Sequence, residues 1–341
     1  MCGLSQKRIM QATRENLPLT AIRGVAAVWV VALHVQPGWF PGAPAGLVSG
    51  LLMGQAAVDI FFVLSGFILA QVYGEIRFEQ APRFWLRRIC RVYPLHLSVM
   101  AVLALSVLAA NALRGSAHPH DWRDFVVVTL LLNPFLQDGS TWSPQSWSVG
   151  VELLCYAMFP LTMRLMGRLP GLLCAGVVVA LALAEALVLH GYDAGSSAVL
   201  RGLVGFHLGA ALCLLLPHLP VRPAPAAALA GVVGIALGIG AASQTAIVLA
   251  AAVTIVSLAP ARGLVASALS RGPLVWLGRV SFSIYLLHAQ LQVALNRTLS
   301  LFLGPWALTA LFVAILIPLS EATYRFIEQP GRRLPSLLRR T

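Results

Sequence analysis

Apolar runs of 18 or more residues recur along nearly the whole chain. A run of about 20 apolar residues is the length that an α-helix needs to cross a bilayer. The chain is 58% hydrophobic and 11% charged, with a mean hydropathy of +0.82, whereas a soluble domain carries about 25% charged residues. The pattern predicts an all-α fold, a polytopic bundle of membrane helices.

The pattern predicts ten spanning helices and one shorter apolar segment. The short segment, Phe125 to Leu136, holds 12 apolar-rich residues interrupted by Pro134, too few to span, so we expect it to be re-entrant or interfacial. The ten spans are predicted at 19–36, 52–73, 93–113, 147–165, 171–190, 198–216, 225–241, 245–259, 274–295 and 303–326.

The distribution of basic residues predicts the orientation of these helices. With the N-terminus in the cytoplasm, eighteen Lys and Arg residues fall on the cytoplasmic side, and only Arg114, Arg123, Arg201 and Arg297 fall outside. Basic residues concentrate on the cytoplasmic side of membrane proteins. We therefore expect both termini in the cytoplasm, and we attribute the net charge of +12 to topology and not to nucleic-acid binding.

The loops between the predicted spans are short, and no internal repeat is evident. Residues 1–341 are therefore expected to form a single transmembrane domain whose chemistry takes place inside the bundle. The five cysteines are scattered without metal-ligand spacing, so no metal site is predicted.

The first predicted span holds two ionisable residues, Arg23 and His34. At 100° per residue, eleven positions bring them to within about 20° of one helix face, about 16 Å apart along the axis. Ionisable groups inside a membrane are usually functional. The structural alternative is that Arg23 reaches the interface and His34 only bonds a neighbouring helix.

Further polar residues lie inside or beside other predicted spans. Asp59 and Ser65 lie in the second, Glu152 at the outer start of the fourth, and Tyr285 in the ninth. Glu152 has a structural alternative, pairing with another helix. For Asp59 structure is the favoured interpretation, because its carboxylate could neutralise an arginine such as Arg23.

Arg87, Arg88 and Arg91 lie on one helical patch, before Pro94. Guanidinium groups bind phosphate oxygens through two parallel hydrogen bonds. The cluster favours a phosphorylated ligand, and anionic lipid is the alternative.

In these motifs the sequence resembles the acyltransferase-3 family of membrane-bound O-acyltransferases. Arg23 and His34 match its Arg-ten residues-His motif, and the stretch from Arg87 to Pro94 matches its RRxxRxxP element. "FFVLSGF", "WSVGVE" with Tyr156, "SFSIYLLH" and "YRFIEQP" are similar to its other signatures, in the same order. Leu153, Cys155 and Gln329 depart from the usual pattern.

The resemblance implies transfer of an acyl group, most often acetyl, from cytoplasmic acyl-CoA to a hydroxyl of a carbohydrate or glycolipid of the cell envelope. It implies a bacterial inner-membrane enzyme whose partners are acyl-CoA, this acceptor and membrane lipid. His34 is the expected general base and Glu152 the second catalytic residue. The residues expected to bind the donor are Arg23, Arg87, Arg88, Arg91, Ser65 and Tyr285.

Three alternatives stay open at this point. A transporter would also combine about ten helices with buried charges, although matching halves are not evident. A lipid-binding scaffold would explain the arginines but not the register of Arg23 and His34. An acyltransferase could instead modify a small glycosylated metabolite.

Overall fold

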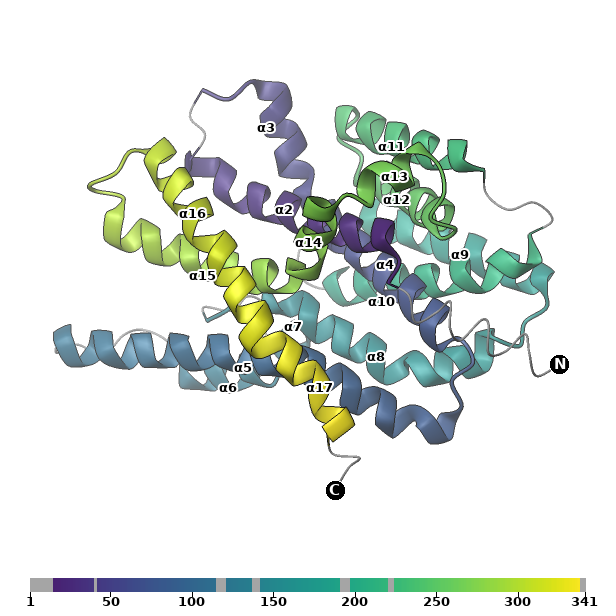
Figure 1. The fold of residues 1–341 in the computed structure, drawn as a ribbon, viewed down its shortest axis with the longest axis horizontal. Helices are drawn as coiled ribbons and strands as arrows, with labels where there is room; N and C mark the ends of the chain where they lie inside the picture. The colour runs from purple at the N-terminus through teal and green to yellow at the C-terminus, as the bar shows by residue number, and fades with distance from the viewer. Residues whose placement is uncertain are drawn as a thin grey trace. The chain divides into compact units, whose positions relative to one another are not determined.

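The computed structural model describes residues 15–39, 42–114, 121–136, 142–190, 197–219 and 224–337. Over these residues the chain forms helices and connecting loops and no β-strand, which confirms the all-α fold (Figure 1). The α-helices are α2 (Leu17–Trp39), α3 (Ala45–Leu52), α4 (Ala56–Tyr73), α5 (Ala81–Arg114), α6 (Trp122–Thr129), α7 (Asn133–Leu136), α8 (Ser146–Met166), α9 (Gly171–His190), α10 (Ser197–Leu215), α11 (Pro225–Gly240), α12 (Gln244–Leu258), α13 (Leu264–Leu269), α14 (Gly272–Arg279), α15 (Ser281–Leu299), α16 (Pro305–Thr323) and α17 (Gln329–Leu337).

Seven helical segments of the described chain are long and apolar enough to cross a membrane. Helices α11 and α12 are apolar but have only 16 and 15 residues. The predicted span 274–295 is divided, because α14 ends at Arg279 and α15 begins at Ser281, whose hydroxyl donates to the Gly278 carbonyl at 2.8 Å. The helical membrane bundle is therefore confirmed, and the count of ten spans stays a prediction.

The segment from Phe125 to Leu136 does not form one spanning helix, in agreement with the prediction that it is too short to span. It is divided between α6, with eight residues, and α7, with four. Between them Leu131 has φ +59°, a left-handed conformation that a helix cannot contain. The imidazole of His96 on α5 bonds the Val128 carbonyl oxygen at 3.0 Å and so ties α6 to α5.

The chain forms two compact units. The first unit is drawn from Met1–Gln36, Ala43–Phe78 and Met158–Ser281, and the second from Pro37–Gly42, Glu79–Ala157 and Phe282–Thr341. The single transmembrane domain over 1–341 stays a prediction.

The first unit is centred on α4 and α10, which lie side by side (Figure 1). A Cβ atom on Gly66 would overlap the Phe206 carbonyl oxygen, and one on Gly209 would overlap that of Val63. Small residues of this kind let membrane helices approach closely. The apolar face of α12 packs against α4, with Ile247 and Ile255 fully buried.

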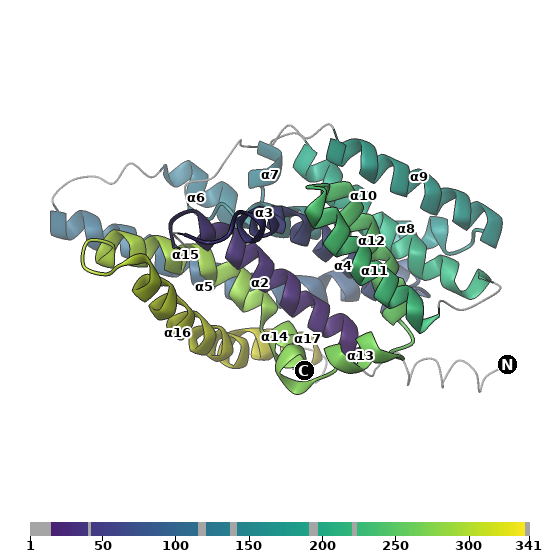
Figure 2. The same cartoon turned by 90° about the horizontal axis from the view of Figure 1, so that it is seen from above.

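Helices α11 and α12 form an antiparallel pair in the first unit, seen side by side in Figure 2. Gly231 and Gly238 of α11 face α12, where added Cβ atoms would press on Thr254 and Ile247. Close contact along both glycines holds these two shorter helices together.

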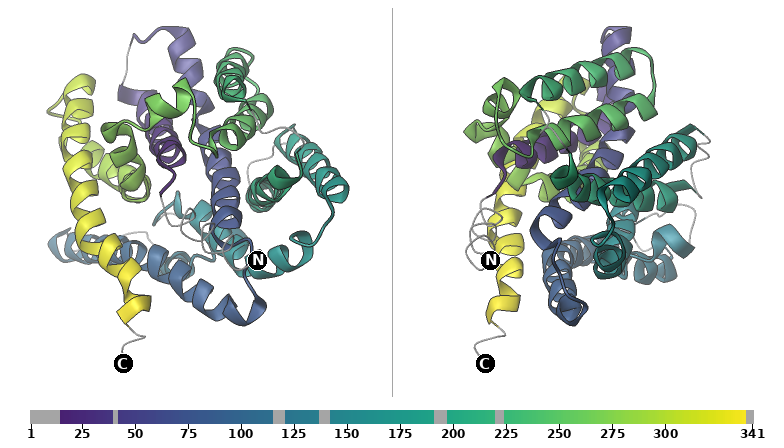
Figure 3. Two further views of the ribbon diagram at one scale, coloured as in Figure 1. Left: turned by 45° about the vertical axis from the view of Figure 1, so that its right-hand side comes forward. Right: turned by 90° about the vertical axis from the view of Figure 1, so that its right-hand side faces the viewer.

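The second unit contains α5, α6, α7, α15, α16, α17 and the first part of α8. Helix α16 continues into α17 through a π-helical turn, η4 (Tyr324–Glu328), and Figure 3 shows the two as a nearly continuous rod. Helix α17 packs across α5 at Gly331, where a Cβ atom would lie 2.7 Å from Pro94 Cγ and 2.9 Å from the Cys90 carbonyl oxygen.

Candidate functional site

Arg23 and His34 lie on α2, and both belong to the first unit. Arg23 is partly buried and His34 is exposed. Because α2 is helical throughout this stretch, the expected register holds, and the two side chains leave the same side of the helix about 16 Å apart.

The structure also defines which nitrogen of His34 can act as a base. His34 Nδ1 lies 2.8 Å from the Val30 carbonyl oxygen on the preceding turn. A carbonyl oxygen only accepts, so Nδ1 carries the proton in the neutral ring and Nε2 carries the lone pair. His34 is therefore in the tautomer that can take a proton at Nε2.

The neighbourhood of Arg23 is packed tightly. A Cβ atom on Gly24 would lie 2.6 Å from the Gly278 backbone nitrogen, so α14 touches α2 beside Arg23. Before the helix begins, Glu15 pairs with Arg279, whose Nη2 lies 2.7 Å from Glu15 Oε2. Partial burial raises the pKa of Glu15, but the hydrogen bond and charge of Arg279 outweigh it and lower the pKa below its ordinary value.

Asp59 neutralises an arginine, as expected, but its partner is Arg201 and not Arg23. Arg201 Nε and Nη2 donate to the two carboxylate oxygens of Asp59, each at 2.9 Å. Gln244 Nε2 adds a third bond at 2.6 Å. Asp59 is fully buried and Arg201 is 2% exposed, so this is a structural ion pair at the contact between α4 and α10.

Glu185 on α9 is a second buried acid in the first unit. It is fully buried and interacts electrostatically with both Asp59 and Arg201. Its Oε1 lies 3.6 Å from the position of a Cβ atom on Gly205, one turn after Arg201. The only sign of it in the sequence is one acid in the apolar run "LALAEALVL", and our sequence analysis missed it.

Ser65 lies on α4 directly before Gly66 and is partly buried. It is thus a residue of the first unit, like Arg23 and His34. The other predicted site residues belong to the second unit.

In the second unit, Ser148, Glu152 and Tyr156 form one polar face of α8, at positions i, i+4 and i+8. The Tyr156 hydroxyl donates to Glu152 Oε1. The indole N–H of Trp85 on α5 donates to the backbone carbonyl of Tyr156 at 3.1 Å and ties α5 to α8 at this point. Glu152 is therefore oriented by a tyrosine one turn along its own helix.

Tyr285 of α15 reaches the Ser148 end of this face. Its hydroxyl lies 2.6 Å from Ser148 Oγ and donates to the Gln145 carbonyl at 3.0 Å. It also interacts electrostatically with Glu152. The structure thus brings together Glu152 and Tyr285, two of the residues predicted from the sequence.

Arg88 reaches the Tyr156 end. Its guanidinium lies 5.8 Å from the centroid of the Tyr156 ring and 5.6 Å from that of Phe84, distances typical of cation–π contacts. The sequence placed the arginines and Glu152 at opposite ends of their helices, whereas the structure brings Arg88 beside the tyrosine that bonds Glu152. Arg91 is partly buried, and Arg87 is exposed.

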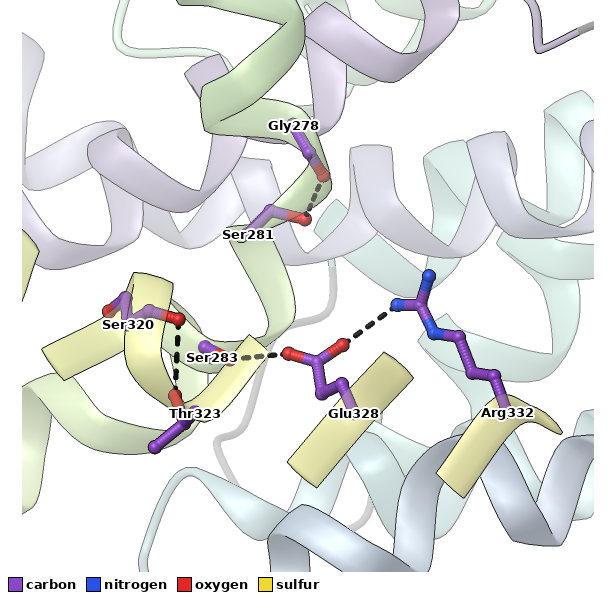
Figure 4. A network of polar contacts seen from close by, with 7 residues as sticks. All are labelled: Gly278, Ser281, Ser283, Ser320, Thr323, Glu328 and Arg332. Atoms are coloured by element: carbon purple, nitrogen blue, oxygen red, sulfur yellow. Dashed lines mark hydrogen bonds and ion pairs between the residues drawn. The ribbon is translucent and has the colours of Figure 1, made fainter. Parts of the chain in front are cut away.

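A further buried acid, Glu328, is the last residue of the π-helical turn η4, and the sequence analysis did not single it out. It accepts from the Ser283 hydroxyl, and its Oε2 lies 2.7 Å from Arg332 Nη2 (Figure 4). The acid and the base four positions later, in "EQPGR", are the signal that could have predicted this pair.

A helical membrane bundle with an oriented histidine, an oriented acid and an arginine cluster has the groups that group-transfer chemistry needs. The chain belongs to the acyltransferase-3 family, whose acyltransferase domain matches residues 17–325.

Curated relatives match shorter segments. The chain is 32% identical to acyltransferase MdmB of Streptomyces mycarofaciens over 160 residues. This aligned segment makes up 45% of this chain and 40% of the relative. The chain is 42% identical over 95 residues to protein 2 in the picA locus of Rhizobium radiobacter, covering 27% and 43%. It is 29% identical over 121 residues to peptidoglycan O-acetyltransferase OatA of Listeria monocytogenes, covering 33% and 18%. The chain thus spans less than half the length of these relatives, and no solved structure matches it.

Proposed function

We propose that this chain transfers an acyl group, in the first place acetyl, from cytoplasmic acyl-CoA to a hydroxyl of an envelope carbohydrate. Membership of the acyltransferase-3 family supports the reaction class. One relative is named a peptidoglycan O-acetyltransferase, which supports a sugar hydroxyl of the envelope as acceptor. The seven apolar helices support an integral membrane protein, and we place it in the bacterial inner membrane with both termini in the cytoplasm.

The observation that carries the proposal is the hydrogen bond from His34 Nδ1 to the Val30 carbonyl. It keeps the basic lone pair on Nε2, where the acceptor hydroxyl can deliver its proton. A general base of this kind accelerates a reaction by about 10²–10⁴-fold.

The donor is held by charge. Arg87, Arg88 and Arg91 bind the phosphates of CoA, because guanidinium–phosphate hydrogen bonds are charge-assisted and bidentate. Arg23 guides the pantetheine arm along α2 towards His34. An extended arm of nearly 20 Å, at bond spacings like those of a peptide, is comparable with the rise of about 16 Å from Arg23 to His34.

The chemical step is direct transfer. The acceptor oxygen attacks the thioester carbonyl carbon while His34 Nε2 takes the hydroxyl proton. The C–S bond breaks, and the CoA thiolate leaves and takes the proton back from the imidazolium, so protons and charge balance. Glu152, oriented by Tyr156, positions the acceptor. Either Ser65 or Tyr285 donates to the developing oxyanion, and Tyr285 would do so by exchanging its bond to the Gln145 carbonyl.

Deletion of the gene and complementation test this function. Envelope glycans from the deletion strain should lack a mass increment of one acyl group, and the wild-type gene should restore it. The His34→Ala gene, expressed to the same level, should not. Identical glycans in all three strains would contradict envelope acylation, and restoration by His34→Ala would remove His34 from the reaction.

A further inference from the structure

The π-helical turn η4 is a departure from regular helix at Tyr324–Glu328, between α16 and α17. π-helical turns insert one extra residue per turn and are frequent at functional sites. This turn leaves Phe326 largely exposed and turns Glu328 fully inward. Arg332, four residues later on α17, then lies on the same side as Glu328.

Arg332 is held firmly in this position. Its Nη2 donates to Glu328 Oε2 at 2.7 Å, and Ser283 donates to the other oxygen of that carboxylate. Its guanidinium also lies 5.6 Å from the centroid of the Tyr324 ring. These contacts leave Nε of Arg332 buried and without a hydrogen-bond partner among the described residues, although the side chain as a whole is 31% exposed.

The same packing brings Arg332 to the arginine cluster of α5. Its neighbour Gly331 is pressed against Pro94 and the Cys90 carbonyl, which flank Arg91. The charges of Arg91 and Arg332 are close enough to repel each other. Arg88 lies on the same face of α5 as Arg91, one turn earlier.

Like charges held together raise the free energy of the protein unless an anion neutralises them. Glu328 offsets one charge, and each of its two oxygens already accepts a hydrogen bond, one from Ser283 and one from Arg332. A phosphate is the ligand whose oxygens match several guanidinium groups at once.

We infer that Arg332 is a phosphate-binding residue for the donor, acting with Arg88 and Arg91 in one anion site formed by α5 and α17. Glu328 is its positioning residue, because it fixes the guanidinium from behind. This inference rests on the proposed function, since it names a further residue that recognises the phosphates of acyl-CoA. Lipid phosphate has the same chemistry and is the other source that the experiment must separate.

The test compares two acetyl donors on full-length protein in nanodiscs of neutral lipid. Acetyl-CoA carries the phosphates, and acetyl-pantetheine carries the same thioester without them. Arg332→Gln should raise the Kd for acetyl-CoA about 10-fold or more, the effect of losing one charge-assisted hydrogen bond, and leave acetyl-pantetheine unaffected. The Kd of Arg332→Lys for acetyl-CoA should lie between those of the wild type and Arg332→Gln. Lysine keeps the positive charge but cannot donate two parallel hydrogen bonds to one phosphate.

Two further variants keep the test decisive. Arg325→Gln is the matched control, because Arg325 is exposed and, among the residues that the structure describes, forms its ion pair with Glu321 on the preceding turn, so acetyl-CoA affinity should not change. Glu328→Gln combined with Arg332→Gln leaves no unpaired buried charge. If Arg332→Gln alone does not fold, this double variant should fold. It should show the same loss of affinity for acetyl-CoA, with unchanged affinity for acetyl-pantetheine.

The outcomes separate the two claims. Wild-type protein that fails to bind acetyl-CoA contradicts the proposed function itself. Wild-type binding with an unchanged Kd in the Arg332 variants overturns the inference alone. Unchanged donor affinity, together with a stability loss seen only in nanodiscs of anionic lipid, would assign Arg332 to lipid phosphate and also overturn it.

Discussion

Replacing Arg201 with Gln should destabilise the protein more than replacing Asp59 with Asn, although both changes break the same ion pair. The pair is buried, with Asp59 fully covered and Arg201 2% exposed. Removing one partner of a buried pair costs about 3–5 kcal/mol, because the other charge is left uncompensated.

The asymmetry comes from Glu185, which interacts with both members of the pair. Without Asp59, Glu185 can ionise beside Arg201 and compensate its charge, so the loss should be about 3 kcal/mol or less. Without Arg201, no cation compensates the buried Asp59 carboxylate and Glu185 cannot replace it, so the loss should reach about 5 kcal/mol. Combining the two changes should cost less than Arg201→Gln alone.

Equilibrium unfolding in mixed micelles, followed by tryptophan fluorescence, measures these differences. Arg279→Gln is the control: it breaks the Glu15–Arg279 pair, whose side chains are 40% and 47% exposed, and exposed pairs contribute about 1 kcal/mol or less. Equal losses for Asp59→Asn and Arg201→Gln would refute the role of Glu185. Losses within about 1 kcal/mol of wild type for both would refute the buried pair itself.

Gly209→Ala should lower thermal stability, because its Cβ would overlap a backbone carbonyl of α4, whereas Gly205→Ala in the same helix meets only ordinary contacts and should be tolerated; equal melting temperatures would contradict this packing. Arg83→Cys should resist a membrane-impermeant thiol reagent in intact cells, and labelling there would reverse the proposed orientation. Tyr156→Phe removes the hydrogen bond to Glu152, so transfer should fall while acyl-CoA affinity is kept; unchanged turnover would show that this bond orients nothing needed in the reaction.

Composition and helical periodicity were enough to predict the fold class and the placing of Arg23 and His34 on one helix face. Both depend on local rules, the length of apolar runs and 100° per residue. The division of the span 274–295 was not predictable in this way, because hydropathy alone does not show that the helix ends at Arg279 and restarts at Ser281.

The partner of Asp59 could not be predicted, because Arg201 lies 142 positions away and only the contact between α4 and α10 brings them together. The pairing also changes the charge argument for topology. Arg201 is buried in the bundle and need not be counted as an outer loop charge, which strengthens the predicted orientation.

The candidate site was predicted in part. Glu152, Tyr285 and Arg88 were identified from the sequence as site residues. Their arrangement along the polar face of α8 was not, because Tyr285 reaches it from α15 and Arg88 from α5. The spacing of Glu328 and Arg332 could have predicted their pairing on one helix. It could not predict that Arg332 lies beside Arg91, because only the contact between α17 and α5 brings these distant parts of the sequence together.

Acyl transfer by His34 variants in inverted membrane vesicles distinguishes a histidine that takes the acceptor proton from one that only packs. Acetyl-CoA labelled in the acetyl group is added at the cytoplasmic face, and labelled glycan and free CoA thiol are measured together with acetyl-CoA affinity. We predict equal amounts of both products from the wild type and a loss of about 10²–10⁴-fold for His34→Ala and His34→Gln alike, with affinity kept, because glutamine can hydrogen-bond but cannot take a proton. A well-folded His34→Gln protein with wild-type transfer would show that His34 packs against a neighbouring helix and does not act as the general base.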